Sequence, residues 1–508
     1  MRKNMKNLFL YTLIVACLVT VTSCDKGFRE LNINPNNPST LDASFLFTNA
    51  EFSTFSATIE NEPTIVQQFI NPFGGITSAF NFNVSNQTYT GARWNNAYPN
   101  SVKLLAQILS QVKTAPTRSN LYNEARIWQA YQFMVLVDSY GDVPYSEAGL
   151  AYLNNTFFPK YDKQSDIYTN LVNELTTATA ALDPTKDIVT ADVFYGGNVA
   201  QWKKLGYSLL LRIGMRYSKL DAAKAQSIVQ AAFTGGVMQS NSDNCFLKYN
   251  STYNNPVSSN IQTLTNTYYL AEPFVTQLKS TGDPRLKYIA AKYSNPGNAL
   301  TLVPDTTSAN QFGLPIGYDS GTLPSSPGYR GAVGSGFNYS QVNYSVFAKL
   351  AAPQYFVTYA QTQLLLAEAA SKGWITGSAA TYYNNGVMAD MDRFASYDAA
   401  AIIPPSTENA YLNNPANAYN SANALKLINT QYWIASFGNG AEAWANFRRS
   451  GYPALTPNPY PGRQIKGDFI RRFIYPISEQ SVNAANYKAA VASIGGSDDL
   501  DMHVFWDK

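Results

Sequence analysis

Aromatic and neutral amide side chains alternate between positions 80 and 96 of this 508-residue chain. Aromatic rings offer flat, rigid, amphipathic faces, and the amides of Asn and Gln both donate and accept hydrogen bonds. Sugars need both groups, because their C–H faces are apolar and their hydroxyls are neutral donors and acceptors. We therefore expect a carbohydrate site here, with Trp94, Tyr89, Asn96 and Asn81 as candidate residues. The interpretation of Trp94 as a buried anchor at a helix start stays equally open.

A second aromatic group lies in a long segment, 293–345, which is rich in Gly, Pro and Ser and shows no periodicity. Long irregular segments within a domain are usually functional or disordered. Tyr329 is the candidate ligand residue of this group, whose other members are Tyr318, Phe337, Asn338 and Tyr339. Packing within the loop is the alternative. The glycines at 331–336 predict a flexible loop, since they do not open a helix after a strand.

Acidic residues between 138 and 147 are the strongest candidates for bond chemistry. Asp138, Asp142 and Glu147 are close enough in sequence to converge, and two carboxylates can hydrolyse a glycosidic bond. The structural interpretation is favoured, because Gly141 and Pro144 are typical of a helix end followed by a loop. The chain contains a single His, which excludes multi-His metal sites and makes a Ser-His-Asp triad improbable. We expect no catalytic residue, no metal and no cofactor.

Basic residues are sparse and scattered. The two arginine pairs, 448–449 and 471–472, are interpreted as structural ion pairs rather than phosphate ligands. The chain has 37 Lys+Arg and 34 Asp+Glu, and charged residues make up only 14% of it. Nucleic-acid binding requires clustered basic residues, so we expect no nucleic-acid partner.

The first 24 residues indicate export. Arg2, Lys3 and Lys6 precede an apolar run at 8–21, which is too short to span a bilayer and is typical of a signal peptide. Cys24 follows small residues, as in a bacterial lipobox. We predict a signal peptide over 1–23, a lipid on Cys24 and an extended tether over 24–43. Cleavage of the signal peptide would remove Arg2, Lys3 and Lys6. The remaining chain would have 34 basic and 34 acidic groups, a balance that favours uncharged ligands.

Apolar residues recur at helical spacing over most of the remaining chain. We predict helices over 101–113, 120–140, 165–182, 199–220, 221–233, 267–279, 359–372, 378–391, 421–437 and 441–449, and a short strand over 469–477. Ser165 is the expected N-cap of the third of these helices. The predicted fold is mainly α, with irregular tetratricopeptide-like helix pairs forming a superhelix, long loops and a few short strands. Residues 44–508 are expected to form one domain.

An ordered set of segments resembles one family over nearly the whole chain. These segments are LNINPNNPS (31–39), DSYGDVPYSEA (138–148), WKKLGYSLLLRIGMRYS (202–218), GDPRL (282–286), FVTYAQTQLLLAEAASKGW (356–374), INTQYWIASFGNGAEAWANFRRSGYP (428–453) and RRFIYPISEQSVNAANY (471–487). Together with the lipobox they resemble the SusD/RagB family of nutrient-binding outer-membrane lipoproteins.

That resemblance implies four tetratricopeptide-like helix pairs that carry a loop-rich binding region. It also implies a lipid anchor in the outer membrane, with the protein facing the cell exterior. The implied partner is a TonB-dependent β-barrel transporter, over which the protein sits as a lid and to which it delivers oligosaccharides. The alternatives are a peptide-binding lid of the same transporter type and a glycoside hydrolase with a carboxylate pair.

Overall fold

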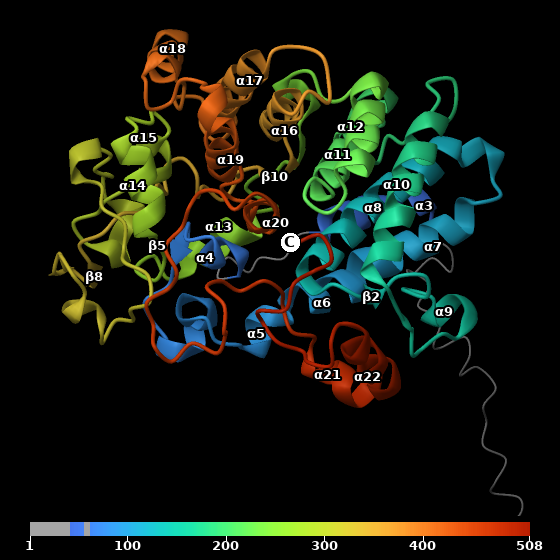
Figure 1. The fold of residues 1–508 in the computed structure, drawn as a ribbon, viewed down its shortest axis with the longest axis horizontal. Coiled ribbons are helices and arrows are strands. Elements are labelled where there is room, and N and C mark those ends of the chain that lie inside the picture. Colours follow the sequence, from blue (N-terminus) through green and yellow to red (C-terminus); the bar gives the residue numbers. More distant parts are fainter. Residues whose placement is uncertain (1–40, 55–60) are drawn as a thin grey trace, which may run out of the picture. The chain divides into compact units, whose positions relative to one another are not determined.

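Helices form most of the computed structural model, which describes residues 41–54 and 61–508 (Figure 1). The longer helices are α3 (Ala43–Phe52), α7 (Lys103–Val112), α8 (Ser119–Tyr140), α10 (Gln164–Ala181), α11 (Val199–Arg216), α12 (Ala222–Gly235), α13 (Pro256–Thr263), α14 (Glu272–Ser280), α16 (Tyr359–Ser371), α17 (Ala379–Asp392), α18 (Pro405–Asn413), α19 (Ala424–Ala435), α20 (Gly440–Ser450) and α22 (Ala484–Ser493). The shorter ones are α4 (Glu62–Ile65), α5 (Gln87–Thr90), α6 (Ala92–Ala97), α9 (Ala151–Asn154), α15 (Leu286–Ile289) and α21 (Ile477–Val482).

Four helix pairs follow one another through the fold: α8 with α10, α11 with α12, α16 with α17, and α19 with α20. Contacts of α10 with α11, of α11 with α16 and of α16 with α19 join successive pairs. Small residues allow close packing between them. A Cβ at Gly206 of α11 would lie 2.0 Å from Oγ1 of Thr179 in α10. This arrangement confirms the predicted superhelix of tetratricopeptide-like pairs.

Strands are short and paired in twos. Antiparallel pairs join β1 (Phe69–Ile70) to β5 (Tyr269–Leu270), β2 (Val143–Pro144) to β3 (Tyr161–Asp162), β4 (Cys245–Leu247) to β10 (Gln354–Val357), β6 (Ala290–Ala291) to β9 (Gln341–Val342) and β7 (Ala332–Val333) to β8 (Gly336–Phe337). The fold is therefore mainly α with a few short strands, as predicted.

Buried charges connect the helix pairs. Arg216 of α11 lies 3.3 Å from Oδ2 of Asp138 in α8 and 2.7 Å from Oε2 of Glu442 in α20. Burial raises the pKa of Glu442, but the guanidinium groups of Arg212 and Arg216 outweigh it and hold that pKa below its usual value. These three helices are distant in sequence, so the charged residues fix their mutual arrangement.

Three local predictions are wrong. The helix expected from 267 begins at 272, because Tyr269 and Leu270 pair with β1 instead. Ser165 lies inside α10, and the side chain of Asp142 accepts a hydrogen bond from the N–H of Gln164 (2.9 Å). The expected strand at 469–477 is absent from the described structure, where the N–H of Arg472 donates to Leu500 O and that of Phe473 to Ser139 O.

The glycine-rich segment at 331–336 also differs from expectation. It forms the hairpin of β7 and β8 rather than a flexible loop, with Ala332 opposite Phe337 and Val333 opposite Gly336. Gly334 occupies the left-handed region, with φ of 53°, which a tight turn requires and glycine tolerates. The same glycines that indicated flexibility thus build an ordered turn.

Residues 43–508 form one compact unit. Within the described ranges, no helix combines the length and apolar character that crossing a bilayer demands. The predicted signal peptide, Cys24 and nearly all of the tether lie outside the described residues. Their assignment stays a prediction from the sequence.

Candidate ligand-binding site

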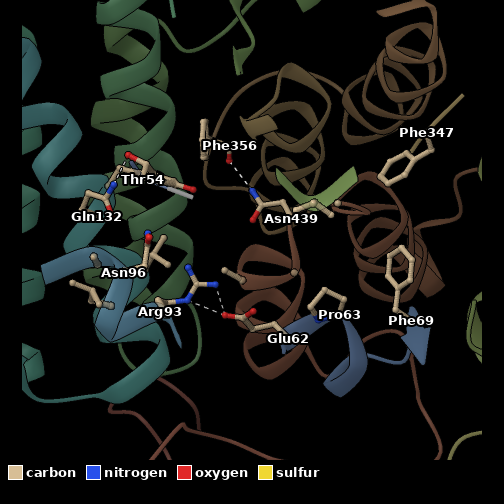
Figure 2. Close-up of a pocket in the computed structure, with 18 residues that line it drawn as sticks. Thr54, Glu62, Pro63, Phe69, Arg93, Asn96, Gln132, Phe347, Phe356 and Asn439 are labelled. Atoms are coloured by element: carbon tan, nitrogen blue, oxygen red, sulfur yellow. Dashed lines mark hydrogen bonds and ion pairs between the residues drawn. The ribbon is translucent and has the colours of Figure 1, made fainter. Parts of the chain in front are cut away.

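A central pocket lies where α4, α6, α8 and the start of α20 meet (Figure 2). Its walls combine aromatic rings with neutral amides, which is the chemistry expected of a sugar site. The lining residues that Figure 2 labels are Thr54, Glu62, Pro63, Phe69, Arg93, Asn96, Gln132, Phe347, Phe356 and Asn439.

The polar groups of the central pocket bond to one another (Figure 2). Arg93 Nε donates to Glu62 Oε1 at 2.9 Å, and Gln132 Nε2 donates to Thr54 Oγ1 at 2.5 Å. Asn439 Nδ2 donates to the carbonyl oxygen of Phe356 at 3.0 Å. A ligand here would have to replace bonds that the protein already makes.

The central pocket is also small. Its cavity volume is about 50 Å³, whereas a water molecule occupies about 30 Å³ in the liquid and small-molecule sites usually measure about 300–1,000 Å³. This volume lies well below the range of small-molecule sites. Size and satisfied bonding together argue against this pocket as the ligand site.

The residues predicted between 80 and 96 do not form one surface. Trp94 is only 6% exposed, and its ring packs against those of Tyr98, Tyr140, Tyr161 and Tyr475 at centroid distances of 4.6–5.9 Å. These surroundings are those of a buried anchor at a helix start, which is the alternative interpretation of Trp94 from the sequence. A sugar cannot stack on a ring that is enclosed in this way.

The other candidates of that segment mostly hold the fold together. Asn96 Nδ2 donates to Ser53 O (3.0 Å) at the edge of the central pocket. Asn81 is 2% exposed, and its side chain accepts from the N–H of Gly317 and donates to Tyr318 O, both at 2.9 Å. Tyr89 is half-buried and lies 6.1 Å from the Phe80 ring. Asn81 thus connects the two predicted aromatic segments, 80–96 and 293–345, by hydrogen bonds. Its role in these contacts is structural.

A larger pocket, which we call the loop pocket, lies between α14 and two loop segments, 311–315 and 327–330. Its volume is about 330 Å³, within the range of small-molecule sites. One wall is a single face of α14, at the helical spacing of Glu272, Val275, Thr276 and Lys279. Ser280 ends the same helix face, and the other lining residues are Gln311, Phe312, Gly313, Pro315, Pro327, Gly328, Arg330 and Tyr339.

Backbone hydrogen bonds hold the two walls together. The N–H of Glu272 donates to Leu314 O (2.9 Å), and that of Leu314 donates to Leu270 O (2.8 Å). Glycine is required at 313, because a Cβ there would lie 2.4 Å from the Cα of Glu272. The start of α14 and the 311–315 segment therefore have a fixed spacing, which sets the width of the pocket.

The second predicted aromatic group lies beneath this pocket. Phe337 and Tyr339 belong to a small hydrophobic core, with Tyr318 and Tyr329 packed against it. The chain neighbours of Tyr329, which are Gly328 and Arg330, line the loop pocket. The backbone N–H of Arg330 donates to the Tyr339 hydroxyl (3.2 Å). The aromatic group thus supports the pocket, and Tyr329 lies next to it.

Two cations share one ring in the loop pocket. The ring centroid of Phe312 lies 3.1 Å from Cζ of Arg330 and 3.8 Å from Nζ of Lys279. Nζ of Lys279 donates to Ala309 O (2.9 Å) and Gln311 O (3.0 Å), which leaves one of its three donors. Burial, followed by the charge of Arg330, lowers the pKa of Lys279.

Sequence reasoning missed both Lys279 and Arg330, which are far apart along the chain. One signal was available: Arg330 is the only basic residue between 293 and 345. A lone basic residue in a long segment rich in Gly, Pro and Ser, next to a candidate tyrosine, is a reasonable ligand candidate. Lys279 offered no such signal, because its role depends on how α14 packs against the loop.

The acidic residues proposed for catalysis are occupied structurally. Asp138 is 4% exposed and accepts a 2.9 Å hydrogen bond from Trp506 Nε1, besides its pairing with Arg216. Asp142 accepts from the Gln164 N–H and from Ser493 Oγ (2.6 Å). Glu147 accepts from the Lys160 N–H at 2.9 Å. These contacts favour the structural interpretation of the motif.

The arginine pairs have structural partners too. Arg449 pairs with Glu368 at 2.7 Å, Arg471 with Asp507 at 3.2 Å, and Arg472 with Asp498. Arg448 instead donates to the carbonyl oxygens of Arg471 (2.6 Å) and Asp138 (2.7 Å). The ion-pair prediction is confirmed for three of the four arginines.

Comparison with known proteins defines the class. The family model for SusD-like proteins, described as starch-binding and associating with the outer membrane, matches residues 35–476. The chain therefore belongs to the SusD-like family, and the resemblance seen in its sequence is confirmed. A search of curated proteins found no significant match.

Solved structures agree with this assignment. A chitin-binding protein shares 30% sequence identity, with a TM-score of 0.81, over 92% of this chain and 100% of its own. A Bacteroidetes SusD-like protein shares 26% identity at a TM-score of 0.80, over the same fractions. A SusD homologue from Bacteroides fragilis has the same fold, with a TM-score of 0.73 and 23% identity over 92% of this chain and 100% of its own.

Proposed function

We propose that this protein binds oligosaccharides in the loop pocket and performs no bond chemistry on them. The observation that carries the proposal is the 330 Å³ hollow between α14 and the central loops, in a fold shared with a 30% identical chitin-binding protein. Pro315 and Pro327 offer apolar contacts for C–H groups. Glu272 and Thr276 offer polar groups for hydroxyls on the same helix face.

Calorimetric titration against a panel of oligosaccharides and peptides tests this proposal. We expect heat of binding with at least one oligosaccharide and none with the peptides. Thr276→Trp, which would fill the pocket from its exposed helix face, should abolish that heat. Binding of peptides without any oligosaccharide would establish the peptide-binding alternative, and release of reducing sugar by the purified protein would favour the hydrolase.

We further propose that the protein is anchored to the outer membrane through a lipid on Cys24 and faces the cell exterior. The apolar run at 8–21, the small residues before Cys24 and the outer-membrane association of the family support this proposal. Metabolic labelling with a fatty acid should mark the wild-type protein but not Cys24→Ala. Cys245→Ala is the matched control, because that thiol is buried and should not affect labelling. Equal labelling of wild type and Cys24→Ala would reject the anchor.

The proposed partner is a TonB-dependent β-barrel transporter that receives the oligosaccharide. The basis is the family resemblance, which implies that the protein acts as a lid on such a barrel. Affinity purification of the lipidated protein from detergent-solubilised membranes should recover a large β-barrel protein. Its repeated absence under gentle solubilisation would contradict the lid role.

A further inference from the structure

The loop pocket carries a local excess of positive charge that the neutral chain does not suggest. Both cationic groups lie against the Phe312 ring, so Cζ of Arg330 and Nζ of Lys279 are at most about 7 Å apart. That separation is shorter than the Debye length of about 10 Å at 0.1 M salt. Their charges therefore repel in the ligand-free protein.

No carboxylate within the described part of the chain forms an ion pair with either cation. Glu272 lines the same pocket, but seven residues separate it from Lys279, which is about 10 Å along a helix. A third cation, Lys292, lies within electrostatic reach of Arg330 and has Asp305 as its own counter-charge. The Phe312 ring attracts both cations but does not neutralise them.

The central pocket provides a comparison, because its cation is paired with a carboxylate. There Arg93 is 14% exposed and pairs with Glu62. Arg126 pairs with Glu174, and Lys204 pairs with Asp243, at two other partly buried positions. The loop pocket instead holds two cations against one ring, the partly buried Lys279 and the exposed Arg330, although bringing two cations together costs electrostatic energy.

We propose that Lys279 and Arg330 bind an anionic substituent, a carboxylate or a sulfate group, on an oligosaccharide held in the loop pocket. The guanidinium of Arg330 has N–H donors suited to a planar or tetrahedral oxyanion. Lys279 adds its remaining donor. An anion that contacts both groups would offset their repulsion and gain charge-assisted hydrogen bonds. The ligand class would then be acidic glycans, such as those containing uronic acids. This inference rests on the proposed oligosaccharide-binding function.

The test compares acidic oligosaccharides with their neutral counterparts. Calorimetry would use oligogalacturonate and its methyl ester, alginate oligomers and their methyl esters, and sulfated and desulfated carrageenan oligomers, with sodium sulfate alone as the free-anion probe. We expect at least one acidic member to bind about tenfold or more tightly than its neutral counterpart. Its affinity should fall as salt rises. Sodium sulfate should bind weakly and compete.

Variants locate the effect. Arg330→Gln and Lys279→Gln should each reduce affinity for the acidic oligosaccharide about tenfold, and they should reduce affinity for its neutral counterpart by a clearly smaller factor. Lys248→Gln is the matched control, because Lys248 also lies over a phenylalanine ring, that of Phe246 at 5.6 Å, but outside the pocket. Thermal melting of each variant checks folding, since both target side chains are at least partly exposed.

The outcomes separate this inference from the proposed function. Equal affinity for acidic and neutral counterparts would overturn the inference and leave oligosaccharide binding intact. An acidic preference that persists in both pocket variants would also overturn it, because the anion would then bind elsewhere. Absence of binding to every oligosaccharide, acidic or neutral, would contradict both proposals.

Discussion

Trp94 illustrates how a residue with the right chemistry can serve the core. Its ring is enclosed by four tyrosines, and its backbone N–H donates to the Tyr140 hydroxyl at 3.2 Å. Tyr140 in turn donates to Thr90 O at 2.5 Å. The short helix α6 is thereby fixed to the end of α8. Trp94 positions the segment on which Arg93 and Asn96 reach the central pocket.

We predict that Trp94→Ala destabilises the protein by about 3–5 kcal/mol, the usual cost of truncating a buried Trp. Affinity for a bound oligosaccharide should change less than about twofold, because the loop pocket is made by other elements. Urea denaturation and calorimetry measure the two effects. Loss of affinity without loss of stability would restore Trp94 as a ligand residue.

Asp138 is the residue on which the buried charge network depends. Asp138→Asn removes the charge opposite Arg216 while keeping side-chain shape, and breaking one side of a buried pair costs about 3–5 kcal/mol. Chemical denaturation should show that loss. Asp166→Asn, an exposed position on α10, is the control and should lose less than about 0.5 kcal/mol. Equal stability of both variants would contradict the role given to Asp138.

Glu408 gives a pH-dependent prediction. Burial and the nearby Asp392 carboxylate raise the pKa of Glu408 to about 7, above its usual value of about 4.5. The folded state therefore binds this proton more tightly than the unfolded state does. The stabilisation is fully present below pH 4.5 and is lost as pH rises towards and through 7.

The measurement is the difference in unfolding free energy between wild type and Glu408→Gln at several pH values. The variant should become more stable relative to wild type as pH rises from 5 to 8, because Gln stays neutral while Glu408 ionises. A difference that is independent of pH would contradict the raised pKa.

At the scale of elements, the spacing between α14 and the 311–315 segment determines the pocket. Gly313→Ala would place a methyl group against the backbone of Glu272, where a Cβ has 2.4 Å of room. We expect a loss of about 1–3 kcal/mol from overpacking and weaker oligosaccharide binding. Gly467→Ala, where a Cβ meets nothing within 4 Å, is the control. Unchanged affinity in Gly313→Ala would show that this contact does not set the site.

Long helices could be predicted from the sequence, and short elements could not. The apolar stripe and the Gly141 stop defined α8, which runs from Ser119 to Tyr140. By contrast, β1 and β5 contain two residues each and exist because distant segments pair. The alternating pattern at 469–477 predicted a strand. Instead, the N–H groups of Arg472 and Phe473 donate to isolated carbonyl oxygens, those of Leu500 and Ser139. Pairing over long sequence distances leaves no local pattern to read.

The types of residue that could form a sugar site could be proposed from the sequence, but their positions in the fold could not. Aromatic and amide residues suggested the chemistry of a sugar site, but the burial of Trp94 and Asn81 depends on residues far along the chain. Tyr329 lies in the loop whose residues Gly328 and Arg330 line the loop pocket, and its role as a ligand residue stays a prediction. Lys279 and Arg330 come together only through packing, so no spacing rule would have joined them.

At the scale of the whole molecule, neutrality and a local positive site coexist. The predicted mature chain has equal numbers of basic and acidic groups, which disfavours polyanions such as nucleic acids. Arg93, Arg126 and Lys204 are paired with carboxylates, whereas Lys279 and Arg330 of the loop pocket form no ion pair with any described residue. A neutral surface with one cationic pocket suits a glycan that carries few, spaced anionic groups.

The measurement that tests the central claim most directly is a crystal structure of the protein with an oligosaccharide selected by calorimetry. We expect electron density for the sugar in the loop pocket, between α14 and the 327–330 segment, in contact with Thr276 and Arg330. Sugar density in the central pocket beside Arg93 and Asn96, or anywhere outside the loop pocket, would contradict it.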